Sequence, residues 1–204
     1  MSDRREIVVL GGGGHAKVVI STLHACGFSV VAVFDDDTSK WGSELMGVSI
    51  VQNDPGRGGA AVIAMGNNGV RKKFAGLNFR WETAIHPSAC VHASVKLGCG
   101  TLVFAGAVIQ PDTVIGDHVI VNTGATIDHD CVIGDFAHIA PGVHFAGGVQ
   151  IGEGTFVGIG SAVIQGIKIG PWATLGAGSV VVDNLPGDVV AFGVPAKIRK
   201  SNSR

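Results

Sequence analysis

Residues 97–133 read LGCGTLVFAGAVIQPDTVIGDHVIVNTGATIDHDCVI, and this stretch decides the fold. Every sixth residue in it, starting at Leu97, is Leu, Ile or Val, and an apolar residue keeps this phase without insertion from Ile85 to Val181. The fifth position of each hexad is mostly small or β-branched, and the second is often glycine. One large and one small apolar residue per hexad indicate a repeated structural unit.

A period of six residues excludes an α-helix, because it drifts around a turn of ~3.6 residues and makes no stripe. A short strand followed by a bend, repeated in stacked coils, instead places the large and the small residue of each hexad inside a β-helix. The pattern resembles that of hexapeptide-repeat acyltransferases, and the resemblance implies a left-handed parallel β-helix with three hexads per coil. The flat outer faces of such a prism carry few charges, so we expect three copies to pack side by side in a homotrimer. After Val181 the pattern stops, and the basic tail is expected to cap the stack.

Composition narrows the class of protein. The 204 residues are 46% hydrophobic and 15% charged, which predicts a folded chain, and the 32 glycines indicate repeated tight turns. A net charge of −1 gives no reason to expect nucleic acid or an anionic membrane surface as a partner. No apolar run approaches the ~20 residues of a membrane helix and no signal-peptide core is present, so we expect a cytoplasmic protein. The four cysteines lack zinc spacing and are expected to be reduced thiols that fill small spaces.

Residues 1–82 follow a different pattern from residues 83–204, and we therefore expect two domains. Strands that alternate with helices predict a Rossmann-like α/β fold with a parallel sheet in the first domain. The expected elements are strands at 7–10, 30–34 and 60–65 and helices at 16–23 and 71–74.

Loops rich in glycine or short polar residues follow each of these strands, where ligands of open α/β sheets bind. The first loop fits G-x-G-x-x-A and Asp35 follows about twenty residues later, a pattern typical of dinucleotide sites. The segment is too short for both halves of a nicotinamide-binding domain. Backbone N–H groups at a helix N-terminus suit any diphosphate, so a nucleotide-sugar is the favoured ligand. A glycine turn that holds no ligand is the remaining interpretation.

The densest polar chemistry of the repeat region lies in residues 122–134. His129 is third in its hexad and should point outward, and Asp130 follows it at once, as expected of a general base oriented by a carboxylate. One coil later the stacked residue is Gly147, whose backbone N–H could bind a developing thioester oxyanion. His138 lies half a coil from His129. The histidines are not spaced as a closed metal site, so no metal is predicted. Solvated or interface positions are expected for the other histidines of the repeats: His86, His92, His118 and His144.

Six motifs spread over the chain carry a family resemblance. They are G-x-x-G-H at 11–15, the Asp35-Asp36 pair, Gly66-Asn67-Asn68-x-x-Arg71-Lys72, Asn122-Thr123, the His129-Asp130 step and Gly193-Val194-Pro195-Ala196-Lys197. With them the chain resembles the nucleotide-amino-sugar N-acetyltransferases of the sialic-acid O-acetyltransferase-like family, which act in bacillosamine, perosamine and related bacterial glycan pathways. The chain departs from some members, which have Ser at the position of Gly13 and Glu at that of Asp130.

The resemblance implies direct transfer of an acetyl group from acetyl-CoA to the C4 amine of a nucleotide-linked 4-amino-4,6-dideoxy sugar. His129 would take the proton of the amine, and Asp130 would raise its basicity. The implied acetyl-CoA site comprises His138 beside the acetyl group, Gly147 at the thioester oxygen, and Ile159 and Ala177 along the pantetheine. The implied nucleotide-sugar site comprises Gly13, Gly14, His15, Asp35, Asp36, Gly66 and Gly69. In a trimer the CoA site would lie between neighbouring prisms.

Two other functions fit the same residues. His129 could serve equally in O-acetylation of sialic acid or a similar sugar, because a hydroxyl also loses its proton during attack. A nucleotide-sugar binding protein without catalytic activity is the alternative from another class. A covalent acyl-enzyme is not expected, since Cys131 falls at the inward fifth position of its hexad.

Overall fold

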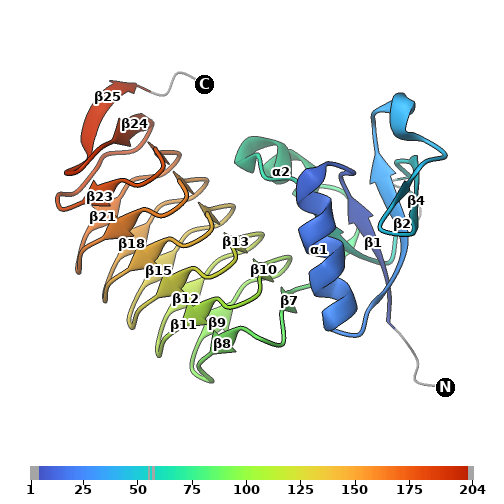
Figure 1. Cartoon of the computed structure of the whole chain (residues 1–204), viewed down its shortest axis with the longest axis horizontal. Helices are drawn as coiled ribbons and strands as arrows, with labels where there is room; N and C mark the ends of the chain where they lie inside the picture. Colours follow the sequence, from blue (N-terminus) through green and yellow to red (C-terminus); the bar gives the residue numbers. More distant parts are fainter. Residues whose placement is uncertain (1–4, 55, 57, 202–204) are drawn as a thin grey trace.

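The computed structural model describes residues 5–54, 56 and 58–201, and the chain forms an α/β part followed by a parallel β-helix (Figure 1). The α/β part runs from strand β1 to strand β6, and the β-helix begins at strand β7. In Figure 1 the two lie side by side, with helix α2 between them. The Rossmann-like fold and the left-handed β-helix predicted from the sequence are confirmed.

The sheet of the α/β part has the order β3-β4-β2-β1-β5-β6 and is parallel except where β3 pairs with β4. The elements are β1 (Glu6–Leu10), α1 (Gly14–Ala25), β2 (Ser29–Asp35), the 3₁₀ helix η1 (Thr38–Lys40), β3 (Glu44–Leu45), β4 (Val48–Gln52), β5 (Ala60–Ile63), α2 (Asn68–Ala75) and β6 (Arg80–Trp81). The sequence predicts β1, β2, β5 and both helices. It misses the β3–β4 hairpin and β6, because strands this short show little periodicity.

The two helices cover opposite faces of this sheet. Successive residues of a strand point to opposite sides, so Ile7 of β1 packs in one apolar cluster with Val19 of α1. The next residue, Val8, packs in a second cluster with Phe74 of α2. Because the central strands are buried on both faces, they read as uninterrupted apolar runs.

The β-helix is a three-sided prism of very short strands. Face 1 contains β7 (Ala84–Ile85), β10 (Leu102–Val103), β13 (Ile120–Val121), β16 (His138–Ile139), β19 (Phe156–Val157), β22 (Thr174–Leu175), β24 (Val189–Phe192) and β25 (Lys197–Ser201). Face 2 contains β8 (Cys90–Val91), β11 (Val108–Ile109), β14 (Thr126–Ile127), β17 (His144–Phe145), β20 (Ala162–Val163) and β23 (Val180–Val181). Face 3 contains β9 (Lys96–Leu97), β12 (Val114–Ile115), β15 (Val132–Ile133), β18 (Gln150–Ile151) and β21 (Lys168–Ile169).

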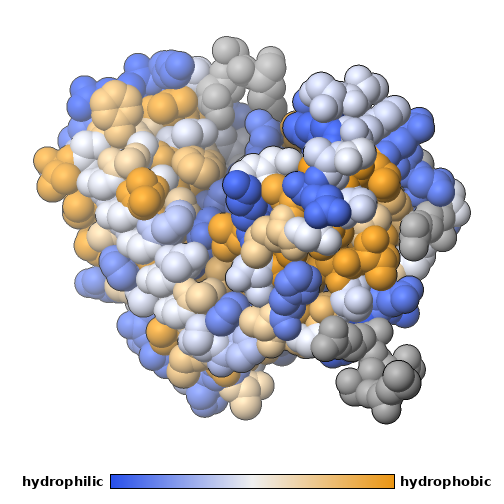
Figure 2. Space-filling view, turned by 45° about the vertical axis from the view of Figure 1, so that its right-hand side comes forward, coloured by the Kyte–Doolittle hydropathy of each residue, from blue (hydrophilic) through white to orange (hydrophobic). Residues whose placement is uncertain are grey.

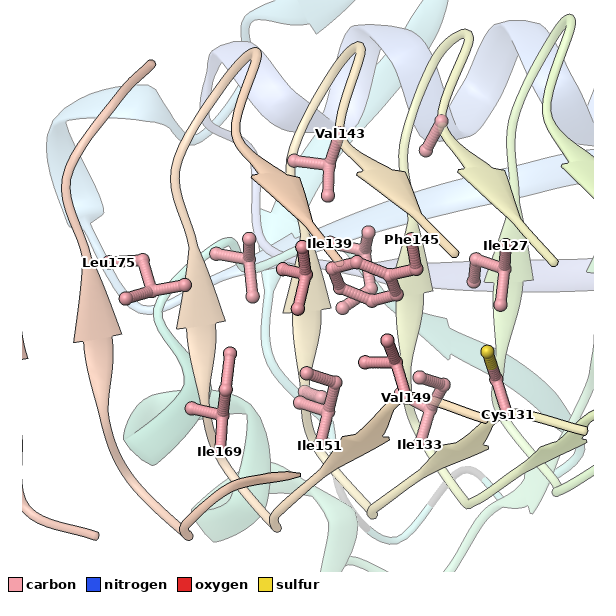
Figure 3. Packing of buried hydrophobic residues seen from close by; sticks show 14 of the residues in the cluster. Ile127, Cys131, Ile133, Ile139, Val143, Phe145, Val149, Ile151, Ile169 and Leu175 are labelled. Atoms are coloured by element: carbon pink, nitrogen blue, oxygen red, sulfur yellow. The ribbon is translucent and has the colours of Figure 1, made fainter. Parts of the chain in front are cut away.

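The register of the strands confirms three hexads per coil. Val103 pairs with Val121, and Val121 pairs with Ile139. From Val103 to Val181 the first residue of every hexad is at most 3% exposed, and Figure 3 shows several of these side chains meeting along the axis of the prism. Ile85 has the same phase but is 39% exposed, because no coil lies beneath it.

At most corners of the prism, the fourth residue of the hexad has a left-handed backbone conformation with positive φ. Glycine commonly occupies this position, as at Gly124 with φ of 65°, but Asp130 stands there with φ of 59°. A left-handed conformation costs an L-residue roughly 1–2 kcal/mol, and Asp tolerates it better than most. This corner fixes the direction of the preceding residue, His129.

The C-terminal tail closes the end of the prism, as predicted. Strand β24 extends face 1 by pairing in parallel with β22, and β25 turns back to pair antiparallel with β24 (Figure 1). The cysteines are free thiols, also as predicted, but only Cys131 is buried in the core. Cys90 and Cys99 are exposed, so the expectation that they fill small spaces is wrong.

Candidate active site

His129 and Asp130 form an exposed hydrogen-bonded pair at the corner between faces 2 and 3. Strand β14 ends at Ile127 and β15 begins at Val132, so both side chains lie in the turn. Nδ1 of His129 lies 2.7 Å from Oδ2 of Asp130, and the two side chains are 60% and 66% exposed. His129 points outward because the first and fifth residues of its hexad fill the core.

The hydrogen bond determines which nitrogen of His129 is basic. A carboxylate can only accept, so Nδ1 carries the hydrogen and Nε2 of the neutral ring carries the free lone pair. The bond to Asp130, followed by the negative charge of Asp128, raises the pKa of His129 above its ordinary value. Asp128 also accepts a hydrogen bond of 2.8 Å from the backbone N–H of His129. The corner therefore presents an oriented base to the outside of the prism.

Gly147 stacks on the His129 ring one coil later. A Cβ atom at this position would lie 2.6 Å from Cε1 and 2.7 Å from Nε2 of His129. Any residue other than glycine would therefore clash with the His129 ring. The N–H of the next residue, Gly148, donates to the carbonyl of His129 at 2.9 Å. The N–H of Gly147 has no acceptor within the described part of the chain. A free backbone donor beside a base can stabilise an oxyanion.

His138 lies on face 1, against the α/β part. Its Nδ1 is 3.2 Å from the carbonyl oxygen of Gly66, and its Nε2 is 3.1 Å from Nδ2 of Asn122. Because a carbonyl only accepts, Nδ1 of His138 carries the hydrogen and Nε2 accepts from the amide of Asn122. Burial lowers the pKa of His138 to about 4, so its ring is neutral near pH 7. Both of its nitrogens are thus occupied by groups of its own chain.

His15, in the first turn of α1, faces the same region. Its ring centroid is 6.0 Å from that of His138 and 5.5 Å from that of Phe104. Burial, and then the charge of Arg71, lowers the pKa of His15 to about 4. Its Nε2 is buried and has no hydrogen-bond partner among the described residues. A buried nitrogen without a partner is costly, so this atom is a candidate for contact with a ligand.

The predicted site residues therefore form two groups. We name the first the base corner (His129, Asp130 and Gly147) and the second the histidine pocket (His15, Gly66, Asn122 and His138). The base corner lies between faces 2 and 3, whereas the histidine pocket lies on face 1, on the opposite side of the prism. No hydrogen bond or ring contact between described residues joins the two groups within one chain.

In the glycine loop after β1, two of the predicted binding residues, Gly13 and Gly14, have free space beside their Cα atoms. No heavy atom lies within 4 Å of the place where a Cβ would stand at Gly13 or Gly14. Both precede or begin α1, so their backbone N–H groups lie at the N-terminal end of the helix, where anions bind. Gly69 is exposed in α2.

Both carboxylate oxygens of Asp35 already accept hydrogen bonds from its own chain. Its Oδ2 accepts from the N–H of Gly12 at 2.6 Å and from Nζ of Lys40 at 2.9 Å, and its Oδ1 accepts from the N–H of Asp37 at 2.9 Å. Burial raises the pKa of Asp35, but these hydrogen bonds outweigh it and lower the pKa. Asp35 thus fixes the glycine loop, and the neighbouring Asp36 is the exposed member of the pair.

Within residues 5–54, 56 and 58–201, no three His, Cys, Asp or Glu side chains are grouped as metal ligands. No helix in this part of the chain is long and apolar enough to span a bilayer.

Comparison with known proteins identifies relatives of both parts. Residues 6–76 match the PglD N-terminal domain, and residues 94–129, 130–158 and 148–183 match the bacterial transferase hexapeptide family of six repeats. PerB from Caulobacter crescentus, solved in complex with CoA and GDP-perosamine, is 45% identical, with 96% of this chain and 97% of that chain covered and a TM-score of 0.90. The chain belongs to the nucleotide-amino-sugar N-acetyltransferase family. The resemblance predicted from the motifs is confirmed.

Two further solved structures are similar to this chain over nearly its whole length. The acetyltransferase domain of PglB from Neisseria gonorrhoeae, in complex with acetyl coenzyme A, is 36% identical over 96% of this chain and 100% of that chain, with a TM-score of 0.88. WeeI from Acinetobacter baumannii is 26% identical over 95% of this chain and 99% of that chain, with a TM-score of 0.74. No curated protein sequence gives a significant match. As a member of this acetyl-CoA-dependent family, the chain is an acyltransferase.

Ile159 and Ala177 stack in successive coils at the corner between faces 1 and 2. The N–H of Gly178 donates to the carbonyl of Ile159 at 2.8 Å, and both side chains are exposed, that of Ile159 by 57%. They form an apolar edge along the prism.

Arg71 is the residue whose role the sequence did not reveal. It is 1% exposed, and burial lowers its pKa to about 10. Its Nε donates to the carbonyl of His118 at 2.8 Å, and its Nη atoms donate to the carbonyls of Phe136 at 2.6 Å and Met65 at 2.9 Å. Arg71 thereby holds the loop that carries Gly66 against the β-helix. Its place in the Gly66–Lys72 motif was the available signal. His118 is an interface residue, buried under α2 and stacked on Phe136.

Proposed function

We propose that the protein transfers the acetyl group of acetyl-CoA to the C4 amine of a nucleotide-linked 4-amino-4,6-dideoxy sugar. The observation that carries this proposal is the base corner, where an oriented histidine with a free Nε2 stands beside an unpaired backbone N–H. The identity of 45% to PerB, whose structure contains CoA and GDP-perosamine, supports the same class of substrate for this chain.

The base corner can carry out direct transfer in two steps. The neutral amine attacks the thioester carbonyl, and Nε2 of His129 accepts the proton that the nitrogen loses. The carbonyl oxygen gains negative charge and accepts a hydrogen bond from the N–H of Gly147. The C–S bond then breaks, and the leaving thiolate takes the proton from His129. The products are the N-acetylated sugar and CoA, and Asp130 stabilises the transient imidazolium.

The α/β part would hold the nucleotide-sugar. Diphosphate oxygens would accept hydrogen bonds from the N–H groups at Gly13 and Gly14, at the start of α1. The sugar would extend toward the histidine pocket, where His15 offers its unpartnered Nε2. His138 would lie beside the acetyl group. Ile159 and Ala177 form an apolar edge suited to the pantetheine arm. The other predicted contacts lie near the ends of β2 and β5. Asp35 ends β2 and Asp36 follows it, Gly66 lies on the loop after β5, and Gly69 lies in the first turn of α2.

The active enzyme would be a homotrimer with its sites between chains. One chain leaves large apolar side chains exposed on the β-helix, among them Val132 at 47% and Ile164 at 38%, and Figure 2 shows apolar residues on the surface of both parts. Packing of prisms would cover them. It would also bring the base corner of one chain toward the histidine pocket of its neighbour, which a single chain keeps on opposite sides. Acetyl-CoA and nucleotide-sugars suit a cytoplasmic enzyme of bacterial surface glycan synthesis.

A thiol-release assay tests the proposal. Acetyl-CoA is combined with UDP-, GDP- and dTDP-linked 4-amino sugars and with the matching 4-hydroxy sugars, for the wild type, His129→Ala and His92→Ala. His92 is an exposed histidine at the same corner of the prism and serves as the control. We expect turnover with an amino sugar that His129→Ala reduces by ~10²–10⁴-fold and His92→Ala leaves unchanged.

The assay also separates the alternatives. Release with hydroxyl acceptors alone would replace N-acetylation by O-acetylation. No release with any acceptor, together with binding of a nucleotide-sugar, would leave a binding protein without catalytic activity.

A further inference from the structure

A small hollow lies where strands β2 and β4 end, on the side of the sheet that α2 covers. Its volume is about 150 Å³, which gives room for one flat aromatic ring system. It is lined by Asp36, Asn53, Lys73, Phe74 and Leu77. Asp36 follows β2 directly and Asn53 follows β4 directly, so both stand at the edge of the sheet where nucleotides bind.

Two of the lining residues present hydrogen-bond acceptors that lack a donor. Oδ1 of Asn53 is buried and has no partner among the described residues. Asp36 makes no hydrogen bond or ion pair with any described residue, in contrast to the saturated carboxylate of Asp35. A buried acceptor left unpaired costs free energy, so the hollow suits a ligand that brings adjacent N–H donors.

The remaining wall is an apolar surface with one cation. Phe74 and Leu77 supply the apolar contact on which a flat ring can pack. Lys73 carries three N–H donors at the rim and has no ion-pair partner within the described part of the chain. The hollow therefore combines acceptors on one side with a donor at the rim.

Among the nucleobases of activated sugars, guanine matches this arrangement. Its N2 amino group and N1–H are adjacent donors, and O6 beside them is an acceptor. Uracil and thymine place a single N–H between two carbonyl oxygens, which would bring acceptors against the acceptors of Asp36 and Asn53. We propose that this hollow is the base subsite and that it selects guanine. The inference deepens the proposed function and rests on it for the sugar, but not for the base.

The position of the hollow agrees with one bound nucleotide. Strand β4 is two strands away from β1 in the sheet, a separation of roughly 10 Å at ~4.8 Å per strand. A nucleoside diphosphate can bridge this distance from the start of α1, at Gly13 and Gly14, to the ends of β2 and β4. The saturated Asp35 lies between, where it fixes the loop.

The test measures binding of nucleoside diphosphates to the full chain by titration calorimetry, without acetyl-CoA. GDP, IDP, UDP and dTDP are compared, because IDP has the ring of GDP without the N2 amino group. We expect GDP to bind most tightly and IDP to bind ~10- to 100-fold more weakly, the loss typical of a hydrogen bond to a charged acceptor. UDP or dTDP binding as tightly as GDP would overturn the proposal.

Asp36→Asn locates the preference in the hollow. It should weaken GDP and bring the ratio of GDP to IDP affinity close to one, while Asp112→Asn, an exposed carboxylate on the β-helix, leaves the ratio unchanged. A ratio that survives Asp36→Asn would overturn the assignment. Selective binding of GDP without thiol release from any GDP-linked sugar would contradict the proposed reaction and keep the guanine subsite. Thiol release that is equally fast with UDP- and GDP-linked sugars would support the proposed reaction and contradict the guanine subsite.

Discussion

At the scale of single residues, the pair His129–Asp130 sets the pH dependence of the proposed reaction. Only the neutral ring accepts a proton, so kcat/KM should rise with pH through the pKa of His129, which Asp130 holds above its ordinary value. Asp130→Asn removes the carboxylate, so the rising limb should move to lower pH and the plateau should fall by on the order of tenfold or more. A pH–rate profile for both proteins checks this, and an unmoved limb would contradict the role of His129 as the base.

The contact between Gly147 and His129 gives a second prediction. Gly147→Ala would place a methyl group only 2.6 Å from Cε1 of His129, which should displace the base and lower kcat by roughly 10²-fold. Gly76→Ala is the control, because its methyl group would be in ordinary contact, 3.6 Å from the nearest atom. Circular dichroism should show both variants folded. Full activity in Gly147→Ala would show that the ring can move away without loss.

The buried histidines predict the behaviour of the fold in acid. Burial lowers the pKa of His15 and of His138 to about 4, below the ordinary 6.5 of the unfolded chain. Their contribution to stability is thus fully present above pH 6.5 and is lost as the pH falls toward 4, where the unfolded state binds protons first. Urea unfolding at several pH values should show this loss as a fall in the free energy of unfolding. His138→Gln should make the free energy of unfolding depend less steeply on pH. An identical slope in the variant would mean that His138 is protonated in the folded state.

Between residue and element, prediction from sequence succeeded where a pattern repeats and where partners are neighbours in the chain. The hexad repeats so many times that its phase is clear even where a single position departs from it. Val103 and Val181 lie in the core as predicted. The step from His129 to Asp130 involves adjacent residues, and Gly147 follows from the coil length alone. The β3–β4 hairpin has no such repetition.

At the scale of elements, α2 fastens the α/β part to the β-helix. Arg71→Met would leave the carbonyls of His118 and Phe136 buried without donors, so the free energy of unfolding should fall by about 3 kcal/mol. Lys17→Met, which removes an exposed cation from α1, should change it little. Chemical denaturation of the three proteins measures the difference. A change below about 1 kcal/mol in Arg71→Met would show that water replaces the guanidinium.

The contacts of α2 also explain why the histidine pocket could not be predicted as a unit. Gly66 and His138 are far apart in the sequence, and they meet only because Arg71 docks the loop after β5 onto face 1. Neither local periodicity nor the motif spacing encodes this docking. The free carboxylate of Asp36 and the saturated one of Asp35 look equivalent in the sequence for the same reason.

At the scale of the whole molecule, the separation of the base corner and the histidine pocket predicts complementation between chains. His129→Ala and His138→Ala should each be inactive as pure trimers. When the two are unfolded and refolded together, random mixing should restore about one quarter of the wild-type sites, those that draw an intact residue from each neighbour. Light scattering would establish the trimer, and thiol release would measure recovery. No recovery from mixed trimers would place both residues in the site of one chain.

The pairing of each strand with its counterpart one coil later has a consequence for the length of the molecule. Duplicating residues 148–165 would add one rung of ~4.8 Å and keep the first residue of every hexad inside, whereas deleting one residue from a strand would turn the following core side chains outward. An insertion or deletion that keeps this pairing can therefore change the distance between the corner that carries His129 and the C-terminal strand only by whole coils. Evolution or design can change that distance only in discrete steps, and each step preserves the contacts within every coil.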